Sequence, residues 1–158
     1  MQVQEIMTKD VSCCSPGTNA AAAAEIMWAK NCGSLPIVED GGRVVGMVTD
    51  RDLFIALGTQ NRRASDLLVG EIMRSEPSVC APEDDVRHAL TTMAKQRVQR
   101  LPVVDASGAL KGIISIDDVL ARTDAVFKDD TIRTLKLICE RLSRSTQQEA
   151  LQSKPATA

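Results

Sequence analysis

The chain has 158 residues, of which 44% are hydrophobic and 2% aromatic, and its formal net charge at pH 7 is −2. This length suits one compact domain or two small packed units, with a core that must be built from aliphatic side chains. The shortage of aromatic rings and of excess positive charge argues against binding to nucleic acid or to an anionic membrane, and we expect neither as a partner.

The five cysteines fit neither a disulfide framework nor a metal site, and the chain has one histidine. No Cys-x-x-Cys pair occurs, so we expect reduced thiols, no bound metal and a cytoplasmic location. The polar N-terminus and the lack of an apolar run of about 18 residues predict neither a signal peptide nor a membrane span. No nucleophile has a base near it in the sequence, and we do not expect an enzyme.

The chain aligns with itself, without a gap, when it is shifted by 66 residues, so that Glu5 falls on Glu71. The motif EIM is then repeated, and Leu35–Val38 (LPIV) falls on Leu101–Val104 (LPVV). Matches of this kind over most of the chain predict an internal duplication. The predicted domains are repeat 1 (1–57), a polar linker (58–66) and repeat 2 (67–124).

Each repeat is predicted to contain, in chain order, a strand, a helix, a hairpin of two strands and a second helix. Thr18 is the expected N-cap of the first helix in repeat 1, and Asp84 holds the same place in repeat 2. Apolar residues at i, i+3, i+4, i+7 and i+8 of this helix predict one buried face. In LPIVEDGGRVVGMVT, two apolar runs flank an Asp-Gly-Gly turn, which predicts the hairpin. The helix positions predicted to be buried are Ala20, Ala23, Ala24, Met27 and Trp28, and in repeat 2 Val86, Ala89, Leu90, Met93 and Ala94.

The segment after repeat 2 predicts one more helix. Apolar residues at a and d spacing, namely Ile132, Leu135, Cys139 and Leu142, indicate a helix over 129–145 that packs on the body or on a partner subunit. The polar tail, 146–158, is expected to be disordered.

The strings EIM…LPIVEDGGRVVGMVTDRDLF and EIM…LPVVDASGALKGIISIDDVL together resemble a tandem pair of cystathionine-β-synthase (CBS) domains, from about Val3 to Arg122. The resemblance implies an α/β (α+β) fold in which two βαββα repeats pack sheet to sheet with pseudo-two-fold symmetry. It implies a regulatory module rather than a catalyst, which binds adenosine-containing compounds such as AMP, ADP, ATP or S-adenosylmethionine in clefts between the repeats. Such pairs have no obligatory cofactor and often form homodimers.

The ribose-recognition pattern of this family is a glycine, two apolar residues, a threonine or serine, and an aspartate three positions further on. The chain carries it twice, as Gly46, Thr49 and Asp52 and as Gly112, Ser115 and Asp118. The resemblance therefore implies ribose or phosphate contacts for the hydroxyl and carboxylate residues of both patterns.

The residues alone leave two roles open for Thr49 and Asp52. Thr-x-x-Asp at a strand-to-helix junction is close to a capping box, in which Thr49 caps the helix and Asp52 complements the helix dipole. A carboxylate in the first helical turn can also accept hydrogen bonds from a cis-diol, beside N–H groups that favour an anion. The two roles do not exclude each other.

The resemblance also implies an adenine pocket. Its backbone and apolar groups come from the strand before the first helix and from the segment that enters the hairpin. The residues at these places are Ser12, Cys13, Cys14, Ser34, Leu35 and Pro36, and in repeat 2 Ser78, Val79, Cys80, Arg100, Leu101 and Pro102.

The two repeats differ in charge next to the predicted phosphate path. Arg51 lies between Thr49 and Asp52, whereas Asp117 lies at the same place in repeat 2. We hypothesise that the cleft at Asp52 takes a phosphorylated ligand better, with a solvated surface charge as the alternative role of Arg51.

Two functions stay open. The chain is either a ligand-sensing regulatory module that acts on a separate protein target, or an assembly scaffold that dimerises without a physiological nucleotide. Tight dimerisation, together with no stabilisation by any adenosyl compound, would favour the scaffold.

Overall fold

The computed structural model describes residues 1–122, 132, 135–136 and 139–140. The C-terminal helix predicted over 129–145 lies partly outside these residues, and the tail predicted to be disordered, 146–158, lies wholly outside them. The described residues of the C-terminal segment are helical.

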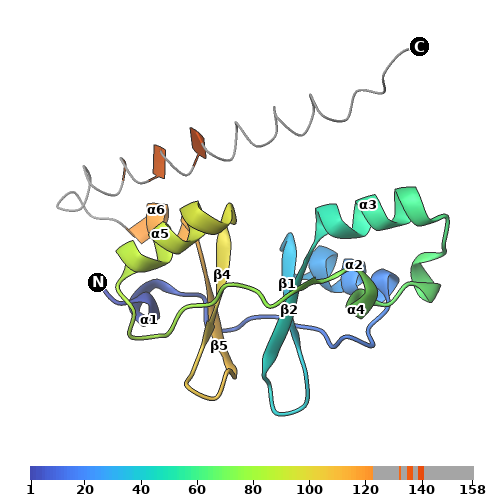
Figure 1. Cartoon of the computed structure of the whole chain (residues 1–158), viewed down its shortest axis with the longest axis horizontal. Coiled ribbons are helices and arrows are strands. Elements are labelled where there is room, and N and C mark those ends of the chain that lie inside the picture. The colour runs from blue at the N-terminus through green and yellow to red at the C-terminus, as the bar shows by residue number, and fades with distance from the viewer. Residues whose placement is uncertain (123–131, 133–134, 137–138, 141–158) are drawn as a thin grey trace.

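Two copies of one arrangement of helices and strands make up residues 1–122 (Figure 1). The first copy has α1 (Val3–Ile6), α2 (Ala20–Ala29), β1 (Ser34–Val38), β2 (Val44–Thr49) and α3 (Asp50–Gln60), followed by the 3-10 helix η1 (Ala64–Asp66). The second has α4 (Val69–Ile72), β3 (Arg74–Ser75), α5 (Val86–Gln96), β4 (Arg100–Val104), β5 (Leu110–Ser115) and α6 (Ile116–Arg122). Apart from η1 and β3, equivalent elements begin 66 residues apart, so the predicted duplication and mixed α+β fold are confirmed.

Each copy contains one antiparallel hairpin, β1–β2 in the first and β4–β5 in the second. Figure 1 shows the two hairpins side by side in the middle of the molecule. Their turns meet, because the N–H of Val44 donates to the Gly108 carbonyl and the N–H of Leu110 donates to the Gly42 carbonyl, both at 3.0 Å. The two copies are thus joined by backbone hydrogen bonds at the hairpin turns.

The strand predicted before the first helix of each repeat is wrong as a continuous strand. In each of the two stretches predicted as strands, Ser12–Cys14 and Ser78–Cys80, only one residue pairs: Cys14 with Ile37 and Cys80 with Val103, both in parallel. The next ladder bond would need an N–H from Pro36, which proline lacks. The proline in each hairpin therefore limits this pairing to a single bridge.

The short helix at the start of each copy packs into the core of the other copy. Val3 and Ile6 of α1 are 0% and 4% exposed and belong to the core around β4 and β5. Leu67 and Val69, just before and within α4, are both 0% exposed and belong to the core around β1 and β2. Figure 1 shows α1 on the side of β5 and α4 on the side of β2. Each hydrophobic core therefore contains residues from both halves of the chain.

The chain that follows each short helix pairs, at or next to a glycine, with the second strand of the other copy's hairpin. After α4, β3 pairs with β2 at Gly46, and after α1, Thr8 bridges Ile113, the neighbour of Gly112. A Cβ atom on Gly112 would lie 2.8 Å from both the Met7 sulfur and the Thr8 carbonyl oxygen. The glycine of the duplicated pattern is therefore required by the close approach of another backbone segment.

The predicted N-caps Thr18 and Asp84 are each one residue too early and are wrong. Asn19 caps α2 and accepts a first-turn N–H at 2.9 Å, and Asp85 caps α5. Thr18 Oγ1 and Asp84 Oδ2 instead accept the N–H three residues earlier, at 3.1 and 2.8 Å. These side chains close the turn before the helix, which leaves the cap to the next residue.

Two of the helix positions predicted to be buried, Ala24 and Trp28, are exposed, and for them the prediction is wrong. Trp28 is 89% exposed, while Ala20, Ala23 and Met27 of the same helix are buried. The α2 face that carries Ala24 and Trp28 borders an open groove shared with α3 rather than a packed core. All five predicted positions of α5 are buried or half-buried.

The predicted polar linker, 58–66, is folded over most of its length. α3 runs on to Gln60, and η1 occupies its last three residues. Between the two helices, Arg62 forms an ion pair with Glu71 of α4. The segment between the repeats is thereby tied to α4.

Candidate functional site

Each hairpin ends at a strand-to-helix junction that is closed by a capping box. Thr49 Oγ1 accepts the N–H of Asp52 at 3.1 Å, and Asp52 Oδ2 accepts the N–H of Thr49 at 3.0 Å and its hydroxyl at 2.7 Å. Between Ser115 and Asp118 the equivalent backbone bonds measure 3.1 and 2.8 Å. The capping role predicted for Thr49 and Asp52 is confirmed.

Capping uses only one oxygen of each carboxylate. The other oxygen, Oδ1, accepts the Arg74 guanidinium at 3.3 Å in Asp52 and the Thr8 hydroxyl at 3.4 Å in Asp118. Both bonds are long. Because an ionised carboxylate has about four acceptor sites, Oδ1 keeps the capacity to accept the hydroxyl groups of a ligand while Oδ2 caps the helix.

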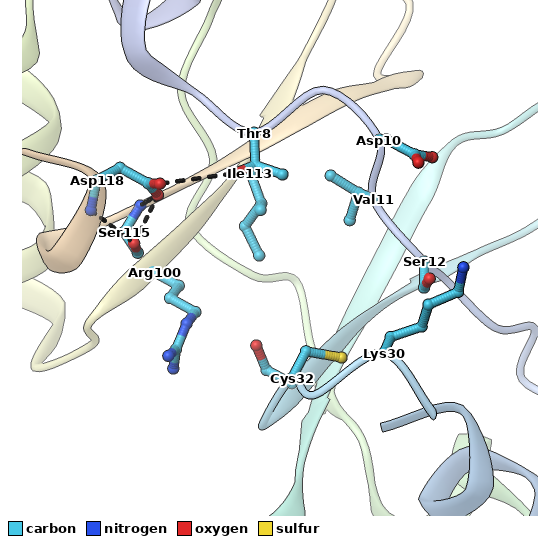
Figure 2. Close-up of a pocket in the computed structure, with 11 residues that line it drawn as sticks. Thr8, Asp10, Val11, Ser12, Lys30, Cys32, Arg100, Ile113, Ser115 and Asp118 are labelled. Atoms are coloured by element: carbon cyan, nitrogen blue, oxygen red, sulfur yellow. Dashed lines mark hydrogen bonds between the residues drawn. The ribbon is translucent and has the colours of Figure 1, made fainter. Parts of the chain in front are cut away.

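A cleft lies beside Asp118, between the two repeats, with a volume of about 270 Å³. Figure 2 shows Ser115, Asp118 and Arg100 on one side of it and Ser12 and Lys30 on the other. Its complete lining is Thr8, Asp10, Val11, Ser12, Lys30, Cys32, Ser34, Arg100, Ile113, Ser115 and Asp118. A molecule held here would contact both repeats and the segment after α1.

A second cleft, of about 300 Å³, lies beside Thr49. Its lining is Gly33, Ser34, Met47, Thr49, Asp50, Arg51, Arg74, Arg97, Val98, Gln99 and Arg100. Ser34 and Arg100 line both clefts and occupy equivalent positions in the two repeats. Both volumes are near the lower end of those typical of small-molecule pockets.

The structure brings part of the predicted site together. The predicted residues that line a cleft are Ser12, Ser34, Thr49, Arg51, Arg100, Ser115 and Asp118. Asp52 bonds to two lining residues, Thr49 and Arg74.

The other predicted residues do not line these two clefts. Leu35, Pro36, Leu101 and Pro102 are buried in β1 and β4, Cys14 and Cys80 lie in the two cores, Cys13 and Val79 are exposed, and Ser78 is half-buried.

Sequence reasoning missed several lining residues. Thr8 and Arg74 each follow the repeated EIM motif, so the self-alignment pairs them, but nothing local shows that each one reaches the opposite hairpin. Asp10, Lys30 and Arg97 lie in loops or at helix ends, where no motif marks them.

Within the part of the chain that the structure describes, no group of three or more His, Cys, Asp or Glu residues is placed to hold a metal ion. None of the helices in that part has the length and apolar character needed to cross a membrane.

The sequence model of the CBS domain family matches residues 3–59 and again residues 69–124. The chain belongs to the CBS domain family and carries two copies of that domain.

Curated relatives match the chain over about three quarters of its length. The CBS domain-containing protein YhcV of Bacillus subtilis is 34% identical over 117 residues, which are 74% of this chain and 81% of YhcV. The inosine-5'-monophosphate dehydrogenase of Thermoplasma acidophilum is 36% identical over 121 residues, which are 75% of this chain. The chain spans only 23% of that dehydrogenase and 61% of an uncharacterized protein of Methanopyrus kandleri.

Solved structures of CBS domain pairs share the fold. The pair from protein MJ0100, solved in complex with 5'-methylthioadenosine and S-adenosyl-L-methionine, has a TM-score of 0.70 and 26% identity, and covers 77% of this chain and 94% of its own. CBSX2, solved in complex with AMP, has a TM-score of 0.67 and 29% identity, and covers 76% of this chain and 93% of its own.

Proposed function

We propose that the protein is a regulatory module that senses adenosine-containing ligands, among them AMP, ADP, ATP or S-adenosylmethionine, in the two clefts between its repeats. The observation that carries the proposal is the duplicated capping box. It leaves one carboxylate oxygen of Asp118 free of the cap in the lining of one cleft, and one of Asp52 bonded to Arg74, which lines the other. The adenosyl ligands of the similar pairs from MJ0100 and CBSX2 support it.

In this proposal each cleft holds one ligand. The Oδ1 atom of Asp52 at one cleft, and that of Asp118 at the other, accepts hydrogen bonds from the two hydroxyl groups of the ligand's ribose. Thr49, Arg51 and Ser115 contact ribose or phosphate oxygens. The base of the ligand in the Asp118 cleft lies against the apolar side chains of Val11 and Ile113, which line that cleft. Burial of the ligand between the repeats then favours one arrangement of the two repeats over another, in proportion to its affinity for each.

The proposed role is regulatory rather than catalytic, and it involves no obligatory cofactor. The match to the dehydrogenase covers 23% of that enzyme, so the activity of the dehydrogenase is not carried over to this chain. We infer that the signal passes to a protein target. Five free cysteines fit the reducing cytoplasm as the place of action.

Thermal unfolding with AMP, ADP, ATP and S-adenosylmethionine, and with guanosine as a control, tests the proposal. A ligand at about 100 times its Kd adds about 2.7 kcal/mol to the free energy of unfolding if it binds only the folded state, which raises Tm by several degrees. The shift of each variant is taken relative to its own ligand-free Tm. We expect Asp52→Asn and Asp118→Asn to reduce it, and the double variant to remove it.

Asp40→Asn is the matched control, because Asp40 is exposed in the β1–β2 turn, outside both clefts. This control should keep the full ligand shift. If no adenosyl compound stabilises the unmodified protein, the sensing proposal is wrong and the scaffold function takes its place.

We also propose that the protein forms a homodimer, through the α2–α3 face of the first copy. Trp28 and Phe54 there are 89% and 78% exposed and flank the groove between the two helices. In the second copy, Leu135 of the C-terminal segment is only 6% exposed and packs in the core beside α5 and α6. No described residue covers the α2–α3 face in this way. Exposed aromatic patches of this kind mark protein interfaces.

Sedimentation measurements of mass test the dimer. Trp28→Asp is expected to convert a dimer to a monomer, because a carboxylate in an apolar interface is costly to desolvate. Val79→Asp is the control, since Val79 is 41% exposed and lies outside the groove, and it should leave the mass unchanged. A monomeric unmodified protein, or a dimer that survives Trp28→Asp, would contradict this interface.

A further inference from the structure

The two clefts share one backbone arrangement but differ in charge. Four arginines line the Thr49 cleft, namely Arg51, Arg74, Arg97 and Arg100. Asp50 is the one carboxylate among the lining residues of this cleft. The cleft beside Asp118, which Ser115 also lines, is called the Ser115 cleft below. The charges of its lining are balanced, because Lys30 and Arg100 are matched by Asp10 and Asp118. The positive charge is therefore concentrated in one of two otherwise equivalent sites.

The duplication shows that the fold does not require these arginines. Sixty-six residues away, the positions equivalent to the four arginines are Asp117 for Arg51, Thr8 for Arg74, Asn31 for Arg97 and Ser34 for Arg100. None of these equivalents is basic, yet the helices and strands around them keep the same layout.

Arg97 is informative because of its backbone. It ends α5 in the left-handed region, with φ of 57°, and its equivalent, Asn31, has φ of 49°. Asparagine adopts this conformation more readily than most residues. The backbone conformation therefore does not favour arginine over asparagine at this position. Arg97 lines the Thr49 cleft, where it adds positive charge.

The guanidinium groups are available to a ligand. Arg74 pairs with Asp52 at 3.3 Å and Arg100 with Asp117 at 3.8 Å, and the side chains of these arginines are 62% and 37% exposed. Exposed pairs of this kind are weak and easily exchanged. Arg51 has no ion-pair partner among the described residues, and it lies in the first turn of α3, where the helix dipole also favours an anion.

We propose that the Thr49 cleft binds the phosphate chain of an adenosine di- or triphosphate, whereas the Ser115 cleft takes an adenosyl compound without phosphates. The inference rests on the proposed function, because it assumes that both clefts hold an adenosine group. Several guanidinium forks along one cleft match the several negative charges of a phosphate chain. In the second repeat Asp117 occupies the position of Arg51. It lies outside the lining of the Ser115 cleft but pairs with Arg100, which lines it, so it adds negative charge next to that cleft.

Arg100 adds a reason for this division. It lines both clefts, so phosphate groups in one cleft compete with a ligand in the other for its single positive charge. When phosphates in the Thr49 cleft hold Arg100, the Ser115 cleft keeps Lys30 against two carboxylates. Its lining then has a net negative charge, which suits an uncharged or cationic ligand.

Titration calorimetry on single-cleft variants tests the inference. Asp118→Asn isolates the Thr49 cleft and Asp52→Asn isolates the Ser115 cleft. We expect the Thr49 cleft to bind ATP at least about tenfold more tightly than adenosine, with an ATP affinity that falls as salt rises. The Ser115 cleft should bind S-adenosylmethionine or adenosine at least as tightly as ATP.

Adding Arg51→Gln and Arg97→Gln to Asp118→Asn should reduce the ratio of ATP affinity to adenosine affinity by about tenfold or more. Arg63→Gln is the matched control, since Arg63 is exposed outside both clefts, and it should leave this ratio unchanged. If both clefts bind adenosine but the Thr49 cleft does not prefer ATP, or keeps its preference without the two arginines, this inference is wrong while the proposed function stands. If neither cleft binds any adenosyl compound, the proposed function itself fails.

Discussion

Val3→Ala is expected to destabilise the second repeat, although Val3 lies at the start of the first. Its side chain is 0% exposed in the core around β4 and β5. Loss of two methyl groups and the cavity left behind should lower the free energy of unfolding by about 2 kcal/mol. Hydrogen exchange should show the larger loss of protection in β4 and β5.

Val69→Ala is the matched variant, because Val69 is the equivalent residue and is also 0% exposed, in the core around β1 and β2. It should lower protection mainly in β1 and β2. If Val3→Ala instead lowered protection mainly in the first hairpin, β1 and β2, this result would contradict the packing of each short helix in the core of the other copy.

Cys80 and Cys14 are expected to resist alkylation in the folded protein. Burial, with a smaller contribution from the Asp84 carboxylate, raises the pKa of Cys80 to about 12. Burial, and then the neighbouring Cys13, raises the pKa of Cys14 to about 11. Since only the thiolate reacts, both should react with iodoacetamide at about pH 8 at least about a hundredfold more slowly than the exposed Cys13.

Mass spectrometry of peptides after timed labelling measures these rates, and labelling in denaturant gives the reference. Because both thiol pKa values are higher in the folded state than in the unfolded state, the protein should be relatively more stable below about pH 9 and lose stability as pH rises toward 11 to 12. Rapid labelling of Cys80 in the folded protein would show that its site opens to solvent.

Local features were predictable from the sequence because they depend on residues close together in the chain. The capping box of Thr49 and Asp52 forms within one helical turn, so its spacing is visible in the sequence. The limits of such patterns also show. Thr18 has the right chemistry for a cap, but it bonds to the preceding turn, and Trp28 has helical spacing but lies on an open groove.

The sequence by itself determined the duplication, the hairpins and the two strand-to-helix junctions, since each of these is set by short-range spacing or by a motif written twice. Only the tertiary structure decided that each short helix completes the other repeat's core, which brings Arg74 to Asp52 and Thr8 to Asp118. It also decided that arginines from separate segments, such as Arg51 and Arg97, face one cleft. Contacts between segments this far apart leave no periodic pattern in the sequence, because they depend on how the folded repeats pack together.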